Sequence, residues 1–490
     1  MLISFIRFFC FVLLFHVFFK TFAGNLSPIS FGFYEARNGI ERYNVLFKTH
    51  NAAITKGVDV DYKGLPSKIE IEIPQNSFPI KLTNNNDFCG ITFVILNKVK
   101  STILFTKIKE IKDIHIEKAV IDSGDFRSVK ELSSGNKILI IYDTNPWGEK
   151  RKGYNYSPMR KDIIYVHKGI GVNKVIKNYN NEYSKPKCFS RSVSNEHTVI
   201  RNVKFIRSED STFKTDLLKM ENLNDLHITD VYIETPTSKL YADAAITINN
   251  CTNVFVNNVV IDGTYSLTNK YGYGLSLNNV YNVTFRHLIA NANWGIFGNN
   301  NLNKVELEKC NINRFDIHSY GTDVTCKKCT FFNLYNQFSS FYGTLKYENC
   351  KFQNFVPILL ETSYNAYTKF DVILNNCEWS ITKTKNYLIN AGNLGDKNNS
   401  RAELTQKYLP NVYIKNLSVK IPNNVDIVYL YKPMSVSNDN LIDLSIIKIN
   451  GLNFNCDKGH KGAILKVSSA DFKTKQNVKY TIEKFKSQVK

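Results

Sequence analysis

The chain has 490 residues, of which 43% are hydrophobic and 22% are charged, a composition that excludes an intrinsically disordered protein. Only 12 prolines and 24 glycines are present, which excludes a collagen-like or linker-dominated chain. Lys and Arg number 63 against 43 Asp and Glu, a formal net charge of +20 at pH 7, so an anionic partner is the first expectation.

Residues 1–23 are typical of a secretory signal peptide. Arg7 precedes an apolar run from Phe8 to Phe19, and Thr21–Ala23 offers small residues where a signal peptidase cleaves. The run is too short to span a bilayer, and no later segment is apolar over the roughly 18 residues that a spanning helix needs. Cleavage removes two cations, Arg7 and Lys20, and no acidic residue from the +20 total, which leaves +18. We therefore expect a secreted or periplasmic protein without a membrane span.

Residues 24–130 are less regular than the later chain, and we interpret them as an N-terminal cap with the first coils of a repeat. Thr49–Ala53 has the pattern of a short amphipathic helix. Alternating apolar residues predict strands at Val58–Tyr62, Ile69–Ile73 and Ile114–Ile121. A helix in this place is suited to cover the open end of a repeat array.

Residues 131–197 interrupt the strand pattern, and we interpret them as a basic, aromatic loop insertion. The charged runs Glu149–Lys152 and Arg160–Lys161 lie close to Trp147, Tyr154 and Tyr156.

An eight-residue pattern then recurs, with apolar residues at positions 1, 3, 6 and 8 and often Asn at position 5. Its copies are Thr198–Phe205, Leu226–Ile233, Val254–Ile261, Val283–Ala290, Val305–Ile312, Val324–Phe331, Leu345–Phe352, Val372–Trp379, Val412–Val419 and Ile447–Phe454. Alternation at positions 1 and 3 indicates a strand with one buried face, and the step from 3 to 6 indicates a corner before a second strand. One such coil cannot bury its own inner face, whereas stacked coils build a continuous core.

This repeat predicts an all-β fold, a parallel β-helix with its core at residues 198–456 and a C-terminal cap or tail at 457–490. A β-propeller fits less well, because its blades need about 40 residues of antiparallel hairpins with tight turns.

Position 6 of the repeat brings four cysteines into one column: Cys310, Cys329, Cys350 and Cys377. Cys326 and Cys329 also form a CxxC pair, which is the spacing of some zinc and redox sites. A partner pair is lacking and both residues occupy inward-facing positions, so we expect a ladder of buried thiols. An odd number of cysteines remains after cleavage of the signal peptide, and no disulfide framework is predicted.

The terminal helix, the VDY-type strand at residues 58–62 and the coils rich in NN and NC corners together resemble the pectate-lyase-like superfamily of right-handed parallel β-helix proteins. Trp294–Asn299, leading into Asn313–His318, is similar to a segment of secreted, carbohydrate-active β-helix proteins of bacteria. The resemblance covers most of residues 40–456 at the level of architecture. It implies an extended polysaccharide lying in a groove parallel to the helix axis. It leaves the reaction open, since the superfamily holds lyases, glycoside hydrolases, esterases and phage-type depolymerases.

The candidate catalytic residues centre on one strand. Between Ile312 and His318 the alternation directs Phe315 and Ile317 inwards, so Arg314, Asp316 and His318 are expected to point to solvent. Neighbouring coils add Tyr320, Glu361 and Tyr364 as catalytic candidates, and Lys270, Tyr271, Tyr273, Trp294, Asn299, Tyr342 and Tyr367 as substrate-binding candidates. Aromatic rings among charged groups suit sugars. The alternative is that these polar rows only satisfy turns.

Neither a metal nor a cofactor is predicted. Some lyases of the superfamily use calcium, but the dense Asp cluster that calcium prefers is missing from any one coil. His50, His115, His227 and His287 stand isolated in the sequence and are expected to be structural or surface residues.

Three functions remain open. The first is a lyase that cleaves a uronic-acid polysaccharide by β-elimination, with Arg314 neutralising the carboxylate, His318 as base and Tyr320 or Tyr364 as acid. The second is an inverting glycoside hydrolase using Asp316 and Glu361, which would lie roughly 10 Å apart if two coils separate them, near the range of about 6.5–9.5 Å for inversion. The third is a non-catalytic glycan-binding protein. Secretion disfavours nucleic acid as a partner, so an acidic polysaccharide is the expected partner.

Overall fold

The structure of the chain is a computed structural model. It describes residues 24–99, 102–108, 116, 118–146, 159–173, 186–193, 196–212, 215–235, 244–263, 273–292, 295–297, 299–333, 335–339, 341–354, 356–360, 369–382, 386–390, 406–407, 410–432, 441–442, 445–457, 464–468 and 478–489. The expected signal peptide lies outside these ranges. Within them, no helix has both the length and the hydropathy that a membrane crossing requires.

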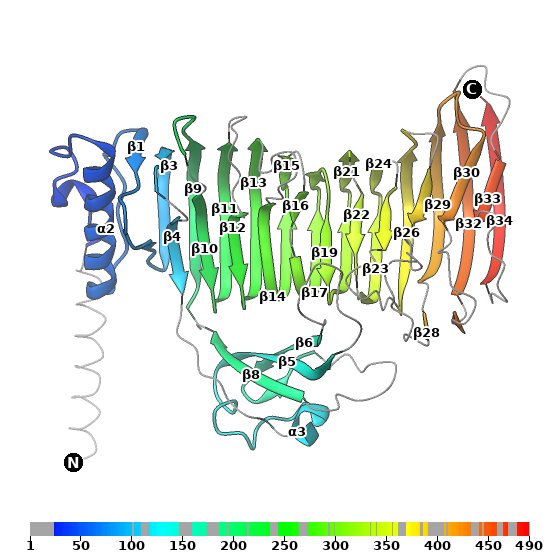
Figure 1. The fold of residues 1–490 in the computed structure, drawn as a ribbon, viewed down its shortest axis with the longest axis horizontal. Helices are drawn as coiled ribbons and strands as arrows, with labels where there is room; N and C mark the ends of the chain where they lie inside the picture. The colour runs from blue at the N-terminus through cyan, green and yellow to red at the C-terminus, as the bar shows by residue number, and fades with distance from the viewer. Residues whose placement is uncertain are drawn as a thin grey trace, which may run out of the picture.

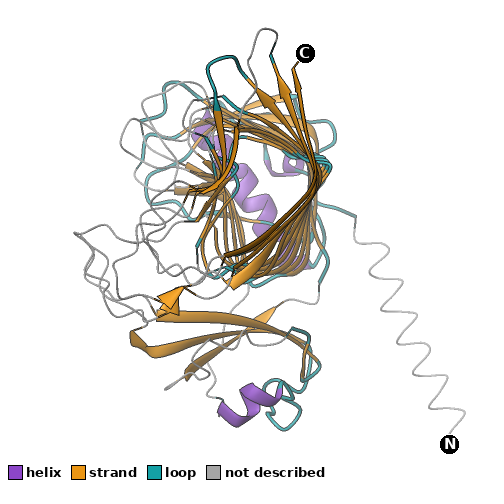
Figure 2. Cartoon of the chain, turned by 90° about the vertical axis from the view of Figure 1, so that its right-hand side faces the viewer, coloured by secondary structure: helices purple, strands orange, loops and turns teal. Residues whose placement is uncertain are grey.

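The chain forms a right-handed parallel β-helix, which confirms the predicted fold class (Figure 1). In the described residues its main sheet has 28 strands, joined by parallel pairings. Viewed along the axis, successive strands superimpose into the sides of a coil (Figure 2). We name these sides the first, second and third walls, in the order in which the chain passes through them from Thr198.

Many strands turn the corner from the first wall into the second: β3 (Asn85–Leu96), β9 (Thr198–Arg207), β11 (Asn224–Thr235), β13 (Thr252–Gly263), β26 (Lys369–Ser380), β29 (Asn411–Ile421), β32 (Ser445–Cys456) and β34 (Val478–Val489). Two strands run from the third wall into the first: β14 (Tyr273–Arg286) and β17 (Asn299–Glu308). Two strands belong to the first wall alone: β20 (Thr322–Lys327) and β23 (Tyr342–Glu348). The shorter strands of the second wall are β1 (Lys68–Glu72), β15 (Ile289–Ala292), β18 (Asn311–Ile312), β21 (Thr330–Asn333) and β24 (Lys351–Asn354).

The third wall comprises β2 (Ile80–Lys81), β4 (Thr102–Ile108), β10 (Thr215–Glu221), β12 (Ala244–Asn249), β16 (Gly295–Phe297), β19 (Asp316–Ser319), β22 (Asn336–Phe338), β25 (Ile358–Leu360), β27 (Tyr387–Asn390), β30 (Ile427–Lys432) and β33 (Ile464–Ser468). A short pair, β28 (Gln406–Lys407) and β31 (Leu441–Ile442), lies in a sheet of its own.

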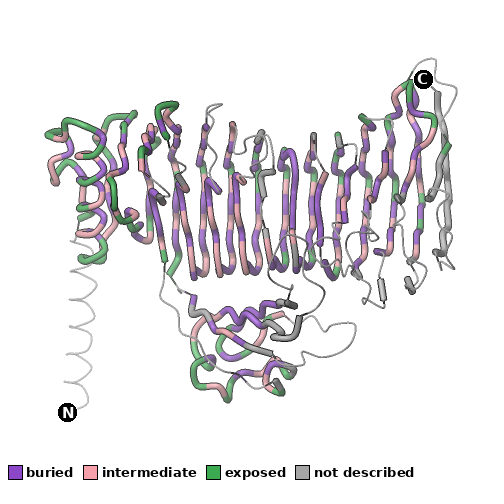
Figure 3. The backbone as a smooth tube through the Cα atoms, in the orientation of Figure 1, coloured by how far each residue is buried: buried purple, intermediate pink, exposed green. Residues whose placement is uncertain are grey.

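The register between coils follows the sequence repeat. Val203 pairs with Val231, which pairs in turn with Val259, and position 6 stays in line as far as Leu452. In the copy that starts at Leu226, the apolar residues at positions 1, 3, 6 and 8 are all at most 1% exposed. Along the strands, buried residues alternate with partly exposed ones (Figure 3), and the buried hydrophobic residues form one cluster that extends along the stack.

Position 5 of the repeat makes the corner between the first and second walls. Asn202, Asn258 and Asn416 stand there with φ between 51° and 59°, a left-handed conformation that Asn tolerates better than most residues. Their side chains also bond from coil to coil, since Asn258 Nδ2 donates to Asp230 Oδ1 at 2.5 Å and Asn416 Nδ2 donates to Asn376 Oδ1 at 2.9 Å. The preference for Asn at this position therefore has both a backbone and a side-chain cause.

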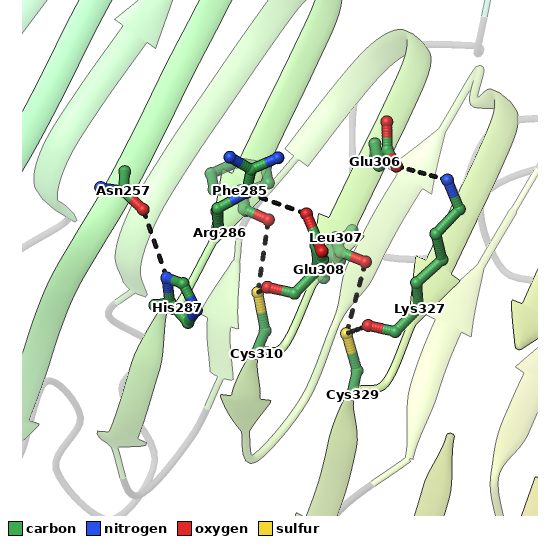
Figure 4. A network of polar contacts seen from close by, with 10 residues as sticks. All are labelled: Asn257, Phe285, Arg286, His287, Glu306, Leu307, Glu308, Cys310, Lys327 and Cys329. Carbon is green, nitrogen blue, oxygen red and sulfur yellow. Dashed lines mark hydrogen bonds and ion pairs between the residues drawn. The ribbon is translucent and has the colours of Figure 1, made fainter. Parts of the chain in front are cut away.

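The predicted cysteine column is present in the second-wall side of this corner. Cys310 and Cys329 donate to carbonyl oxygens of the preceding coil, Cys310 to Phe285 at 3.5 Å and Cys329 to Leu307 at 3.4 Å (Figure 4). No disulfide forms among the cysteines of the described chain. Burial raises the pKa of Cys377 to about 12, so the thiolate that reacts with oxidants is scarce there.

The N-terminal end of the coil stack is covered by α2 (Gly39–Lys56), which follows the short η1 (Pro28–Phe31). The helix contains the predicted Thr49–Ala53 but is longer, because Asn38 caps its first turn and Gly57 ends it in a left-handed conformation. Figure 2 shows α2 lying across the far end of the coils. Its buried face includes His50, whose Nε2 lies 2.6 Å from the Tyr62 hydroxyl.

The segment 131–197 differs from the expected loop. It holds a four-stranded antiparallel sheet in the order β7-β6-β5-β8, built from β5 (Asn136–Pro146), β6 (Met159–His167), β7 (Ile170–Gly171) and β8 (Pro186–Val193), next to α3 (Lys118–Ser123). One face has its own small core, which includes Leu139 and Ile164. The other face packs on the β-helix, where Tyr165 stacks on Tyr281 with ring centroids 5.4 Å apart. The insertion is therefore a small packed unit, while Trp147, Tyr154 and the run 149–152 lie outside the described residues.

The coils also continue past residue 456, where a tail was expected. β34 pairs with β32, with Phe485 opposite Leu452, and β33 pairs with β30.

Removing one core ring should measure what coil stacking contributes. Phe352 is fully buried and stacks on Phe331 of the previous coil, with centroids 5.6 Å apart. We expect Phe352→Ala to lower the free energy of unfolding by about 3–5 kcal/mol, measured by guanidinium denaturation. Lys351→Ala, at an exposed neighbouring position, should change it little, and equal effects of the two substitutions would contradict this packing.

Burial of His50 should make the fold sensitive to acid. Desolvation lowers the pKa of His50 from 6.5 to about 3, so between these values the unfolded chain binds a proton that the folded chain does not. Stability is then complete above pH 6.5 and falls as the pH drops towards 3, by up to about 5 kcal/mol. Urea unfolding of His50→Gln should show a shallower loss over this window than the parent chain, and identical pH slopes would refute the assignment.

Candidate functional site

Arg314, Asp316 and His318 form a row on the outer side of the third wall. Phe315 and Ile317 alternate with them and lie in the hydrophobic core, so the inward and outward directions agree with the sequence prediction. Asp316 Oδ2 lies 2.5 Å from Arg314 Nε and 3.7 Å from His318 Nε2. One carboxylate oxygen therefore faces both the Arg314 guanidinium and the His318 imidazole.

The expectation that all three side chains face solvent is wrong for two of them. The side chains of Arg314 and Asp316 are 2% and 0% exposed, whereas His318 keeps 14%. Arg314 is enclosed by the next coil, since its Nη2 donates to Gln337 Oε1 at 2.7 Å and its guanidinium lies 4.7 Å from the centre of the Tyr335 ring. Its charge is thus directed at Asp316 and is not available to a substrate carboxylate.

Arg314 and Asp316 form a buried ion pair in this wall. Burial disfavours the charged form of Arg314, but the Asp316 carboxylate outweighs that effect and raises the pKa of the guanidinium above its ordinary value. Two charges buried this deeply are costly and persist only when well paired. An ionisable group with a shifted pKa beside a partly exposed histidine marks this row as a candidate functional site.

Tyr273 joins the row from β14, 45 residues before His318 in the sequence. Its hydroxyl lies 3.2 Å from His318 Nε2, and the two rings meet edge to face with centroids 5.6 Å apart. In the intervening coil, the residue of β16 that pairs with Tyr273 is Gly295, which carries no side chain. Tyr273 was expected to bind sugar, and the structure places it against the candidate base.

Tyr320 occupies a corner between the third and first walls. In the four preceding coils this corner is an asparagine with φ between 51° and 60°, and the amides bond along the stack: Asn222, Asn250, Asn279 and Asn301. Tyr320 has φ 63° and is 8% exposed. A left-handed aromatic residue is unusual, and strained backbone concentrates at functional sites. Tyr320 therefore shapes the turn after His318, and Tyr273 is the phenol that contacts the imidazole.

The other predicted residues are dispersed or undescribed. Tyr342 begins β23 in the first wall and is 8% exposed, so its ring is not available to stack on a sugar as expected. Asn299 begins β17 and pairs with Ile317, which places its backbone beside the row. The remaining candidates lie outside the described residues: Lys270, Tyr271, Trp294, Glu361, Tyr364 and Tyr367.

A groove of about 430 Å³ lies elsewhere, on the first wall near the C-terminal end. Its lining combines one aromatic ring, two cations and two amides with two aliphatic residues: Asn375, Tyr413, Ile414, Lys415, Lys448, Ile449 and Asn450. None of these residues was a candidate from sequence. The alternation in Val412–Lys415 and Ile447–Asn450 would have identified the polar ones as outward-facing, because the intervening residues are at repeat positions 1 and 3.

A third polar cluster joins two histidines to one carboxylate. Asp225 Oδ2 lies 2.8 Å from His197 Nδ1, and Asp225 Oδ1 lies 2.9 Å from His227 Nε2. The expectation that His227 is isolated is therefore wrong. Of the groups in the described chain, this one could hold a metal ion.

The comparisons with known proteins concern the fold. Neither a protein-family model nor a curated protein matches the sequence. The tailspike protein gp49 from Pseudomonas phage LKA1 superimposes with a TM-score of 0.54 at 13% identity, over 94% of this chain and 83% of that one. The Gp54 tailspike of Acinetobacter baumannii bacteriophage AP22, solved in complex with A. baumannii capsular saccharide, has a TM-score of 0.50 at 13% identity, over 93% and 79%. Likeness at this identity establishes the shared β-helix fold alone.

The buried ion pair gives a direct test of the site's electrostatics. Asp316→Asn leaves the buried Arg314 guanidinium without its counter-charge, so we expect a loss of about 3–5 kcal/mol in the free energy of unfolding. Glu234→Gln, which breaks the half-exposed pair with Lys204, should cost less than about 1 kcal/mol. Denaturant unfolding of both variants provides the measurement. An unchanged free energy of unfolding in Asp316→Asn would show that water reaches the pair.

Proposed function

We propose that this protein is a secreted enzyme that binds an acidic polysaccharide on the outside of its β-helix and cleaves it by β-elimination at His318. The observation that carries the proposal is the contact of Tyr273 with a partly exposed His318 above the buried Asp316–Arg314 pair. A base, His318, and a proton donor, Tyr273, then lie next to each other on the third wall. The buried Asp316–Arg314 pair lies next to His318.

In this proposal His318 removes the proton on the carbon next to the uronate carboxylate. The electrons of that C–H bond form the new double bond, and the glycosidic C–O bond breaks on the leaving side. Tyr273 lies within hydrogen-bond reach of the imidazole and can deliver a proton to the leaving oxygen. Asp316, 3.7 Å from Nε2, stabilises the positive charge that develops on His318.

Arg314 acts in this scheme through Asp316, and not on the substrate. Another cation must therefore neutralise the uronate, and Lys270, three residues before Tyr273 in the sequence, is our candidate. The net charge of +20 supports an anionic substrate, because a basic surface attracts acidic polymers. The groove at Tyr413, Lys415 and Lys448 offers both a ring face and cations for a sugar chain. The Gp54 tailspike, which shares the fold, was solved in complex with a capsular saccharide.

A hydrolase is supported less well by the same geometry. An inverting mechanism needs two carboxyl groups that reach the glycosidic bond and a water molecule. Asp316 is fully buried and paired with Arg314, so it is not free to serve as one of them.

A panel of acidic polysaccharides tests the proposal. The purified protein should generate unsaturated uronates, followed by their ultraviolet absorbance, from at least one of pectin, alginate, chondroitin, hyaluronan and heparosan. His318→Ala and Tyr273→Phe should each lower kcat by about 10²–10⁴-fold and leave binding of the polymer intact. Tyr232→Phe, a tyrosine beneath Lys204 on the second wall, serves as the matched control.

The other outcomes are distinct. New reducing ends without the absorbance would replace the lyase by a hydrolase, and binding without any product would leave a glycan-binding protein. Full activity of His318→Ala would remove this histidine from the mechanism.

A further inference from the structure

We propose that His197, Asp225 and His227 form a binding site for a transition-metal ion of the zinc type, on the first wall near the N-terminal end of the stack. The inference is independent of the proposed function, because Asp225 and His227 lie on β11 and His197 immediately precedes β9, whereas the proposed catalytic row lies on the third wall at β19.

The register of the sheet brings the three residues together. Leu226 pairs with Thr198, so Asp225 and His197, each one residue earlier, lie opposite one another in adjacent coils. His227 follows two residues after Asp225, and its flanking residues Leu226 and Ile228 are fully buried, so its imidazole points outwards. The cluster is thus built into two stacked coils and does not depend on a long loop.

The donor atoms already converge. The two oxygens of Asp225 lie 2.8 Å from His197 Nδ1 and 2.9 Å from His227 Nε2, and the ligand atoms of the group all lie within 4.8 Å of one another. Around tetrahedral zinc, with bonds of about 2.0–2.2 Å, neighbouring ligand atoms are roughly 3.3 Å apart. The side chains are 36–50% exposed, so small rotations about χ1 and χ2 can close the remaining distance.

Ring contacts limit the imidazoles to small movements. His197 and His227 meet edge to face with centroids 4.5 Å apart, and His227 lies 5.4 Å from the ring of Phe255 in the next coil. Contacts of this kind around a ligand reduce the freedom that metal binding must remove.

The donor set selects the kind of ion. Two imidazole nitrogens and one carboxylate suit zinc and its neighbours in the first transition series, whereas calcium and magnesium prefer a shell of oxygens. Three protein ligands leave a fourth position open to water or to an anionic group. On binding, the ion replaces the protons that now join each ring nitrogen to Asp225, and those protons pass to solvent or to the other ring nitrogen.

Titration of zinc into the full-length, tag-free protein tests the site, with competition against a chromophoric chelator as the readout. We expect one tight equivalent, no competition from millimolar calcium, and visible d–d absorption of a low-coordinate complex when cobalt replaces zinc. His227→Ala should weaken zinc binding by at least about 100-fold, since even loss of a group behind a metal ligand costs about 10–100-fold.

Two further variants make the result decisive. Asp225→Asn keeps the shape of the side chain but is a poorer ligand, so it should also weaken binding if the fold, checked by circular dichroism, is retained. His287→Ala removes another exposed histidine of the β-helix, which contacts Asn257, and should bind zinc as the parent does. No tight equivalent, or binding unchanged in both His227→Ala and Asp225→Asn, would overturn the proposal.

Discussion

Parallel pairing of each coil with the next is the constraint on which the rest of this molecule depends. A coil's inner face is apolar and its two strand edges are unsatisfied, so each coil is stable only between two others. The chain meets this condition with a repeat whose register holds from Val203 to Leu452. At the N-terminal end α2 replaces a neighbouring coil. The stack also sets the positions of the outward-facing side chains in each cluster described above.

The inward-facing residues and the corners of the coils are predictable from sequence, because both depend on neighbouring residues in the chain. Strand alternation has a period of two, and a corner with positive φ favours Asn, so the repeat copy at Val254 or Val372 indicates both its strands and its turn. The insertion was harder to predict. Its buried run Ile138–Ile141 has no alternation, and a neighbouring basic segment suggested a loop where β5 and β6 pair.

The contacts between outward-facing residues of different coils depend on how many residues separate one coil from the next. The direction of Asp316 was predictable, but its burial depends on Arg314, Gln337 and Tyr335 from other turns of the chain. Tyr273 reaches His318 across an intervening coil, and the unequal lengths between repeats hide that alignment. The His197–Asp225 contact, in contrast, was accessible from sequence, because each residue stands immediately before a copy of the repeat.

The buried cysteine column offers a way to measure how often neighbouring coils separate. Cys350 and Cys377 lie buried between coils, and a buried thiol with a raised pKa reacts with an alkylating reagent only after its coil separates from its neighbour. Cys89, near the capped end, is exposed and supplies an internal reference for reagent strength. The relative labelling of these thiols would therefore record how often the middle of the solenoid opens, without any added probe.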